Sequence, residues 1–201
     1  MDWSNADFSH GLPDTLNGVQ VMMNGQPAAI YYISAGQINV QAPSSTASGG
    51  TVTVQVIRNG TPGNSVTLSG SAVAPGLFTY SADLKTYYPA ATFLDGSIIG
   101  DPAVFGNAVH KAKVGDQIVL YATGLAVSPA GVLIPAPLGT SGVTVKIGST
   151  VVTPSFAGLV APGEFQINLA VPQGVAVGNQ PLFVVVNGQS SQTGVVLPIG
   201  N

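Results

Sequence analysis

The chain contains the motif Gln-Ile-Asn plus an apolar residue twice, and each time a proline stands four positions after the asparagine. The two copies are GQINVQAP at residues 36–43 and EFQINLAVP at residues 164–172, with Gln37 and Gln166 129 positions apart. Proline has no N–H to donate to a β-ladder, so it is expected to end the strand that carries the motif.

The segments around the motif repeat in the same order. Residues 18–32 (GVQVMMNGQPAAIYY) align with 142–156 (GVTVKIGSTVVTPSF), and residues 52–60 (VTVQVIRNG) align with 181–189 (PLFVVVNGQ). Strands, turns and prolines follow one another identically in both halves, which is the mark of an internal repeat. We therefore interpret the chain as one fold present twice.

Short strand patterns dominate both copies. Residues 52–57, 143–147 and 165–171 alternate apolar and polar side chains, whereas 118–121 and 182–186 are continuously apolar, as in strands at the centre of a sheet. Asn-Gly pairs at 17–18, 24–25, 59–60 and 187–188 favour type I′ hairpins. The sequence predicts an all-β protein made of two tandem immunoglobulin-like sandwiches, at residues 12–74 and 75–201.

The two copies differ in what precedes them. Residues 111–129 (KAKVGDQIVLYATGLAVSP) supply an opening strand and a loop ahead of the second copy, and residues 90–99 suggest an additional N-terminal hairpin there. The polar residues 1–15 show no comparable strand pattern. We therefore expect the first sandwich to lack its first strand.

The matching segments include residues 16–43, APGLF at 74–78, DGS at 95–97 and KVGDQIVLYATGL at 113–125. With the second-copy segments, they resemble an IPT/TIG-type immunoglobulin-like domain. From about residue 12 onward the chain resembles the uncharacterised C-terminal domain of large secreted Acidobacteria (Solibacter-type) proteins. That family usually has an apolar strand ending in a Phe-Gly-x-Asn-Leu-like turn before its first copy, which this sequence lacks. The resemblance implies an extracellular accessory module on a longer parent chain, without an established activity.

The composition excludes several classes of partner. Charged residues make up 6% of the chain, against about 25% in ordinary globular proteins, and the five Lys and Arg cannot form a basic patch for nucleic acid. The absence of cysteine excludes disulfides and thiolate metal sites. No apolar run reaches the roughly 18 residues of a membrane span. The N-terminal residues lack a signal-peptide pattern, so we expect a secreted chain whose signal has been removed.

Metal-binding patterns are weak. A zinc or copper site needs about three converging ligands, which His10 with Asp7 and Asp14 could supply on paper, as could His110 with Asp101 and Asp116. Asp95, Asp101 and Asp116 are the candidates for calcium, but each stands in a turn context, and turn chemistry is the favoured explanation of all three. We predict no metal site and no cofactor.

Catalytic patterns are weak as well. The chain has no G-x-S-x-G elbow, and Glu164 is its only glutamate, so a pair of catalytic carboxylates would have to include turn aspartates. We predict no catalytic residues and no enzymatic activity.

Aromatic side chains are the better indication of a binding site. Tyr87 and Tyr88 stand in the polar stretch SADLKTYYPA, and Trp3 stands near the N-terminus. These three are the predicted ligand-binding residues, because sugar rings stack on flat aromatic faces. Tyr31 and Tyr32 fall in or near a strand, so one ring is expected to face outward and the other inward.

Three functional hypotheses follow. The first is a non-catalytic extracellular module for adhesion, surface attachment or polysaccharide binding. The second is an assembly module in which another chain, or a second copy, supplies the absent strand by β-augmentation. The simpler explanation of the absent strand, which we favour, is that the parent chain supplies it. The third is a hydrolase with an unrecognised site that involves His110 or Glu164.

Overall fold

The computed structural model describes residues 11–129, 131–132 and 138–201. In these residues strands predominate, accompanied by the helix α1 (Pro102–Phe105) and the short 3-10 helices η1 (Ser44–Ser48) and η2 (Gly106–Ala108). The prediction of an all-β fold is confirmed. The strands form two compact units; the first consists of the described residues within 1–72, 127–136 and 161–163, and the second of the remaining described residues. The chain therefore returns twice to the first unit after leaving it.

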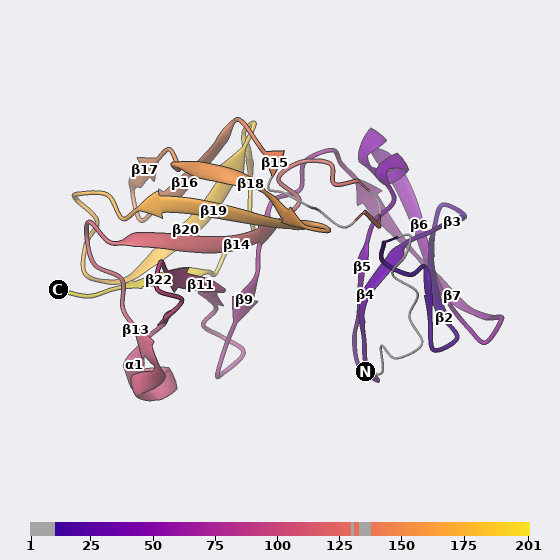
Figure 1. Cartoon of the computed structure of the whole chain (residues 1–201), viewed down its shortest axis with the longest axis horizontal. Helices are drawn as coiled ribbons and strands as arrows, with labels where there is room; N and C mark the ends of the chain where they lie inside the picture. The colour runs from indigo at the N-terminus through magenta and orange to yellow at the C-terminus, as the bar shows by residue number, and fades with distance from the viewer. Residues whose placement is uncertain (1–10, 130, 133–137) are drawn as a thin grey trace. The chain divides into compact units, whose positions relative to one another are not determined.

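The first unit has two antiparallel layers, drawn in indigo and purple in Figure 1. One layer has the order β1-β2-β6-β7 with β3 added to β2, and the other is the pair β4–β5. Val19, Val21, Ile30 and Val52 are buried between the layers. The strands are β1 (Thr15–Leu16), β2 (Val19–Met23), β3 (Gln26–Pro27), β4 (Ala29–Ile33), β5 (Ile38–Gln41), β6 (Gly50–Arg58) and β7 (Thr61–Gly70).

The second unit has more strands in each layer. One sheet has the order β13-β12-β11-β14-β19-β18-β15 with β8 added to β14, and the other has the order β17-β16-β20-β21 with β22 added to β20. A separate pair joins β9 to β10. The strands are β8 (Gly76–Leu77), β9 (Thr79–Tyr80), β10 (Tyr88–Pro89), β11 (Ala91–Phe93), β12 (Ile98–Ile99), β13 (Val109–His110), β14 (Gln117–Thr123), β15 (Leu138–Gly139), β16 (Val143–Ile147), β17 (Thr150–Val152), β18 (Phe156–Ala161), β19 (Glu164–Ala170), β20 (Gly178–Val186), β21 (Gln189–Ser190) and β22 (Val196–Ile199).

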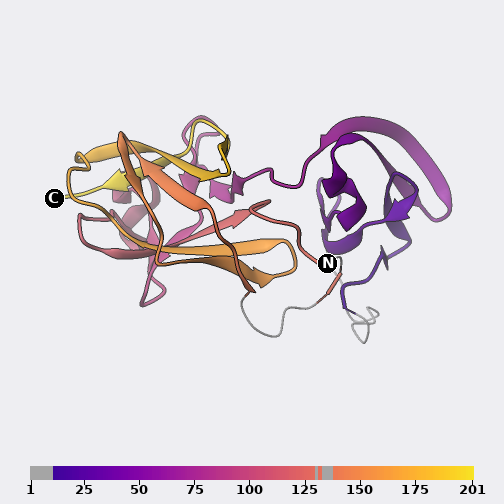
Figure 2. The same cartoon turned by 90° about the horizontal axis from the view of Figure 1, so that it is seen from above.

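The core of the second unit lies between these two sheets. Figure 2 separates them, with β20 in yellow in one layer and β19 in orange in the other. Phe165, Ile167 and Leu169 alternate along β19 and are fully buried, as period-two patterning requires of a strand with one face in the core.

The pairing of strands bears out the internal repeat. β2 pairs with β6 in the first unit as β16 pairs with β20 in the second. In each pair a glycine with φ of +74° lies against an asparagine: a Cβ on Gly18 would meet Asn59 Oδ1 at 2.0 Å, and one on Gly142 would meet Asn187 Oδ1 at 2.9 Å. The Gln-Ile-Asn strands also end as predicted, β5 before the first motif proline and β19 before the second.

The Asn-Gly turns have the predicted geometry. Asn17, Asn24, Asn59 and Asn187 have φ between 48° and 50°, and each following glycine also has a positive φ. Two successive residues with positive φ are the signature of a type I′ turn, whose twist matches that of the flanking strands. These turns fix the register of the hairpins in which the apolar faces meet.

Candidate binding surface on the first unit

The predicted tyrosine platform does not form. Tyr88 is 2% exposed, and its ring packs edge-to-face on Phe105 with centroids 5.3 Å apart, while Tyr80 lies 5.9 Å away. Tyr88 belongs to the short strand β10, and its side chain points into the core of the second unit. The prediction that Tyr88 contacts a ligand is therefore wrong, because burial and ring packing leave it no free face.

Tyr87, the neighbouring predicted ligand-binding residue, is less constrained than Tyr88. The ring of Tyr87 is partly exposed, and its hydroxyl donates a hydrogen bond to the carbonyl oxygen of Leu84 at 3.1 Å. Ligand contact by Tyr87 stays a prediction. Trp3 lies outside the described residues, as do His10 and Asp7.

The aspartates considered as calcium ligands hold their own turns. Asp95 Oδ1 accepts hydrogen bonds from the hydroxyl and the backbone N–H of Ser97, at 2.6 and 2.9 Å, and these bonds lower the pKa of Asp95. Asp116 Oδ2 accepts from the backbone N–H of Lys113 at 2.8 Å. Within the described ranges, no three His, Asp or Glu side chains gather into a metal-binding group.

Asp101 has a similar structural role. Its carboxylate caps α1 by accepting from the backbone N–H of Ala103 at 3.0 Å, and it pairs with Lys111 Nζ at 3.0 Å. Desolvation alone would raise the pKa of Asp101, but the hydrogen bonds from Lys111 and Ala103 outweigh it and lower that pKa. His110, next in the chain to Lys111, has an exposed side chain.

The pKa of Glu164 shifts in the opposite direction to the pKa values of Asp95 and Asp101. It is half-buried at the start of β19, and desolvation raises the pKa of its carboxyl group. A carboxyl group with a raised pKa favours the folded state while it is protonated, and this contribution is lost as the pH rises through the folded-state pKa.

We expect Glu164→Gln to raise the melting temperature at pH 7 to 8 and to leave it nearly unchanged below about pH 4, where an ordinary glutamate is protonated. Melting curves of both proteins across this range provide the check, and the acidic points are the internal control. A difference of the same size at every pH would show that desolvation of the charge is not its cause.

A groove in the second unit offers no acid–base chemistry. It has a volume of about 480 Å³ and is lined by residues 139–143 and 153–157. This lining presents the hydroxyl groups of Thr140, Ser141, Thr153 and Ser155, and it includes no ionisable side chain. The groove can accept hydrogen-bonding ligands, but its walls supply no general acid or base.

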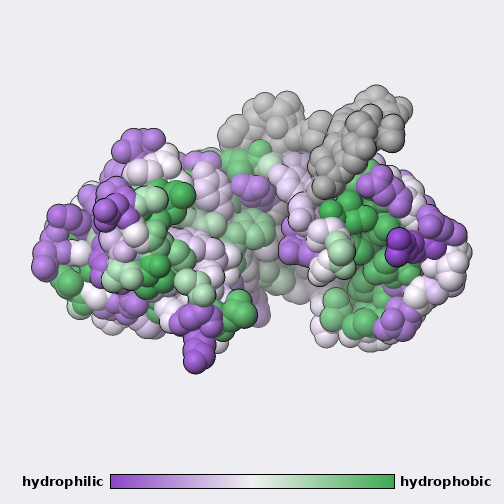
Figure 3. Space-filling view, turned by 90° about the horizontal axis from the view of Figure 1, so that it is seen from below, coloured by the Kyte–Doolittle hydropathy of each residue, from purple (hydrophilic) through white to green (hydrophobic). Residues whose placement is uncertain are grey.

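The first unit carries a less completely buried apolar surface. Leu68 and Val66 of β7 pair with Val52 and Val54 of β6, and directly paired residues share one face of a sheet. Val52 is buried, so this face points to the core, yet Val66 and Leu68 are 52% and 55% exposed. Figure 3 shows hydrophobic residues gathered on one face of this unit.

The facing layer contributes two more residues to this surface. Val40 of β5 pairs with the buried Ile30, so Val40 faces the core, and alternation places Ile38 on the same side. Both side chains are only half-buried. We call Ile38, Val40, Val66 and Leu68 the open strip.

In the second copy, the positions that correspond to Ile38 and Val40 are fully buried. Ile167 and Leu169 of β19, which align with Ile38 and Val40, are 0% and 1% exposed. In that unit β14 pairs with β19 and covers this part of the core. In the described residues of the first unit, β5 pairs with β4 and with no other strand. The lack of an opening strand in the first unit stays a prediction.

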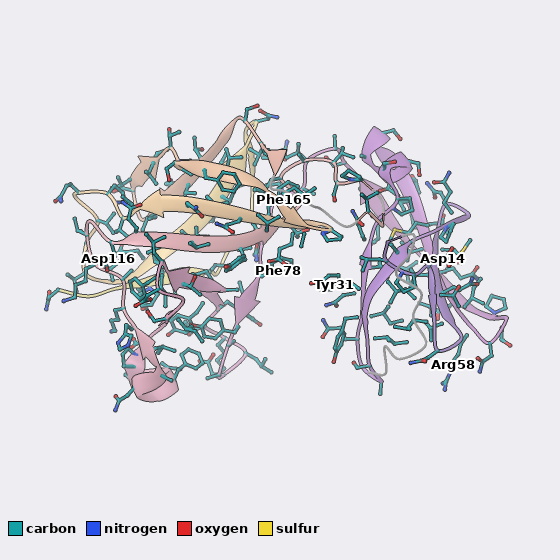
Figure 4. All side chains as sticks on the ribbon, in the orientation of Figure 1. Asp14, Tyr31, Arg58, Phe78, Asp116 and Phe165 are labelled. Carbon is teal, nitrogen blue, oxygen red and sulfur yellow. The ribbon has the colours of Figure 1, made fainter. Side chains whose placement is uncertain are left out.

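A second feature of the first unit is an exposed pair of tyrosines. Tyr31 and Tyr32 of β4 are both exposed, because the ladder between β4 and β5 shifts register between Ile30 and Tyr32. Such a bulge breaks the alternation of side chains. The expectation that one ring faces inward is therefore wrong. In Figure 4, Tyr31 projects from β4 away from the sheet that contains β2, β6 and β7.

A buried glutamine ties a distant segment into the first unit. Gln41, 7% exposed, donates through Nε2 to Ser128 Oγ at 2.6 Å and to the carbonyl oxygen of Pro129 at 2.7 Å. Its Oε1 accepts from the backbone N–H of Gly131 at 2.7 Å. These bonds hold Ser128, Pro129 and Gly131 against the end of β5.

Two backbone groups complete this network. Ser128 Oγ also accepts from the N–H of Gly163 at 3.1 Å, and the carbonyl oxygen of Gly131 accepts from the N–H of Leu12 at 2.8 Å. The sequence analysis missed both the network and the open strip. The one available signal was Gln41 itself, because the aligned residue in the second copy is Ala170.

The layered, antiparallel arrangement defines an immunoglobulin-like β-sandwich protein. A profile of the IPT/TIG domain matches residues 9–80, which include all seven strands of the first unit. Domains of this class are commonly non-catalytic and take part in protein–protein contacts or adhesion. Within the described residues, no helix is long and apolar enough to cross a membrane.

Comparison with solved structures and curated proteins gives little more. The titin Ig tandem domains A164-A165 are similar at 12% identity and a TM-score of 0.27, over 90% of this chain and 79% of that chain. No curated protein matches the chain. The narrower resemblance to secreted Acidobacteria proteins stays a prediction.

Proposed function

We propose that the chain is a non-catalytic extracellular module that attaches to a partner at a cell surface, with the first unit supplying the contact. The open strip is the observation that carries this proposal. Val66 and Leu68 are more than half exposed on the core-side face of their sheet, although their sheet partners are buried or half-buried. Apolar side chains exposed together mark a contact surface.

The remaining features agree with attachment rather than turnover. The IPT/TIG match covers the unit that carries the open strip. The candidate aspartates are engaged in local turns, and the groove of the second unit presents no ionisable group. The hydrolase hypothesis therefore finds no geometric support among the described residues.

Polysaccharide is the second candidate partner, favoured by the tyrosines of β4. Tyr31 and Tyr32 are adjacent and exposed, and aromatic rings presented side by side can stack on sugar rings. Their position on a strand holds them more firmly than a loop would, which suits a binding platform.

Co-sedimentation separates these two candidates. The chain is incubated with insoluble polysaccharides and with cell-envelope preparations, and the supernatants are assayed for protein and for released sugars. We expect binding to at least one of these materials without release of sugar. Release of sugar, or a lack of binding to every material, would contradict the proposal.

Paired variants identify the surface that binds. If the partner is a polysaccharide, Tyr31→Ser/Tyr32→Ser is expected to weaken binding at least tenfold, whereas Phe78→Ser, at an exposed aromatic residue of the second unit, serves as the control. If the partner is an apolar protein surface, Leu68→Asp is expected to weaken binding instead. Equal binding by all of these variants would place the contact elsewhere.

A further inference from the structure

The free edge of β5 has a fully paired counterpart in the same chain. In the second unit, β19 lies between β18 and β14. In the described residues of the first unit, β5 is hydrogen-bonded to β4 alone. Since β5 and β19 carry the same repeated motif, the β14–β19 pair is an internal template for a strand on the open edge of β5.

The backbone of β5 is oriented to accept such a strand. In β19, Ser155 N–H bonds to the carbonyl oxygen of Asn168, whereas Val171 N–H bonds to that of Asp116 beside β14. Because backbone groups alternate along a strand, Ile167 and Leu169 turn theirs toward β14. The aligned Ile38 and Val40 therefore turn their N–H and C=O groups toward the open edge.

The backbone orientation of Gln37, the residue before Ile38, agrees with this assignment. The carbonyl oxygen of Gln37 accepts from Ser34 N–H at 2.8 Å, which places the backbone of Gln37 on the β4 side. The next residue, Ile38, then points to the other side.

The template also specifies the side chains of the incoming strand. Ile118 and Leu120 of β14 stand opposite Leu169 and Ile167, and all four are essentially inaccessible to solvent. An antiparallel strand on β5 would place its corresponding residues opposite Val40 and Ile38. The side chains of these incoming residues would lie over the space toward which Val66 and Leu68 point.

We propose that the edge of β5 accepts an extended strand of a separate polypeptide that has the apolar alternation of β14. This inference rests on the proposed function and names the chemistry of the partner: backbone hydrogen bonds to Ile38 and Val40, with large aliphatic side chains packed on the open strip. Strand addition to a sheet edge gains affinity from the backbone and specificity from alternate side chains.

A second copy of this chain does not offer β14 as the donor. β14 is already paired on one edge with β19 and on the other with β11 and β8. Strand β14 of a second copy is therefore not available, and the proposed occupant is a segment of a different polypeptide with the same pattern.

The experiment uses a labelled synthetic peptide with the sequence of residues 115–124 (GDQIVLYATG), titrated with the whole chain and followed by fluorescence anisotropy. Saturable binding is expected. Leu68→Asp in the chain is expected to weaken it at least tenfold. Val151→Asp, an equally exposed valine on β17 of the second unit, is the matched control and is expected to bind normally. The peptide with Leu120→Pro lacks one N–H of the ladder and is expected not to bind.

Amide hydrogen exchange locates the bound peptide. Slower exchange at Ile38 and Val40 is expected when the peptide is present. The proposal is overturned by absence of binding, by equal binding to the Leu68→Asp chain, or by binding without protection at β5. Concentration-dependent dimers that exclude the peptide would also overturn it, in favour of a second copy.

The outcomes for the two proposals are separable. Failure of the peptide to bind, together with retained co-sedimentation, removes the strand-acceptor inference and leaves attachment intact. Peptide binding without co-sedimentation leaves the acceptor edge intact and removes attachment to the tested surfaces.

Discussion

Replacing Gln41 by leucine is expected to destabilise the first unit by about 1–3 kcal/mol, because it removes the side-chain partner of two partly buried backbone groups, and an unsatisfied buried group costs about 1–3 kcal/mol. Gln41 bonds to the carbonyl oxygen of Pro129 and to the N–H of Gly131. Leucine is close to glutamine in size, so the loss should arise from hydrogen bonding rather than from a cavity.

Urea unfolding measures the loss of stability, and amide hydrogen exchange assigns that loss to one of the two units. Amides of β2 and β6 are expected to exchange faster in Gln41→Leu under native conditions, and the N–H of Gly131 is expected to lose its protection. Gln37→Leu is the matched control, because Gln37 is exposed and bonds only locally, to Asn39 Oδ1 at 2.6 Å. Similar losses in the two variants would show that the buried network contributes nothing specific.

Gln41 and Gln37 illustrate which structural features could be predicted from the sequence and which could not. The turns and the repeat were predictable, because Asn-Gly geometry and strand alternation depend on neighbouring residues. The bonds of Gln41 connect residues 87 to 90 positions apart, and no local pattern encodes such a pairing. The exposure of Val66 and Leu68 on β7 was likewise not predictable, because it depends on what packs against that face of the sheet.

The aromatic residues were misjudged for a related reason. Tyr88 appeared to stand in a polar loop, but it contacts Tyr80 and Phe105, which come from other elements of the second unit. The exposure of both Tyr31 and Tyr32 depends on a bulge in the ladder with β5. A bulge shifts alternation by one residue, and the composition of a strand alone does not specify where that shift occurs.

The second unit has a backbone contact that tolerates no side chain. Gly124 follows β14 with φ of +69°, and a Cβ added there would lie 2.0 Å from the carbonyl oxygen of Ala74. The obstacle is backbone, and Ala74 N–H also donates to the carbonyl oxygen of Gly124 at 2.9 Å. An alanine could enter only if the chain ahead of β8 moved and this hydrogen bond was lost.

We expect Gly124→Ala to destabilise the second unit by about 3 kcal/mol or more, combining about 1–2 kcal/mol for an L-residue at positive φ with the displaced hydrogen-bonded backbone. Gly96→Ala is the control, since Gly96 has φ of +84° but no atom within 4 Å of an added Cβ, so it carries the conformational cost alone. Urea unfolding measures both losses, and hydrogen exchange should show faster opening at β8 and β14 in Gly124→Ala only. If the two variants were equally stable, the close approach of Ala74 to Gly124 would contribute nothing, and the pairing of β8 with β14 would not depend on a glycine at this position.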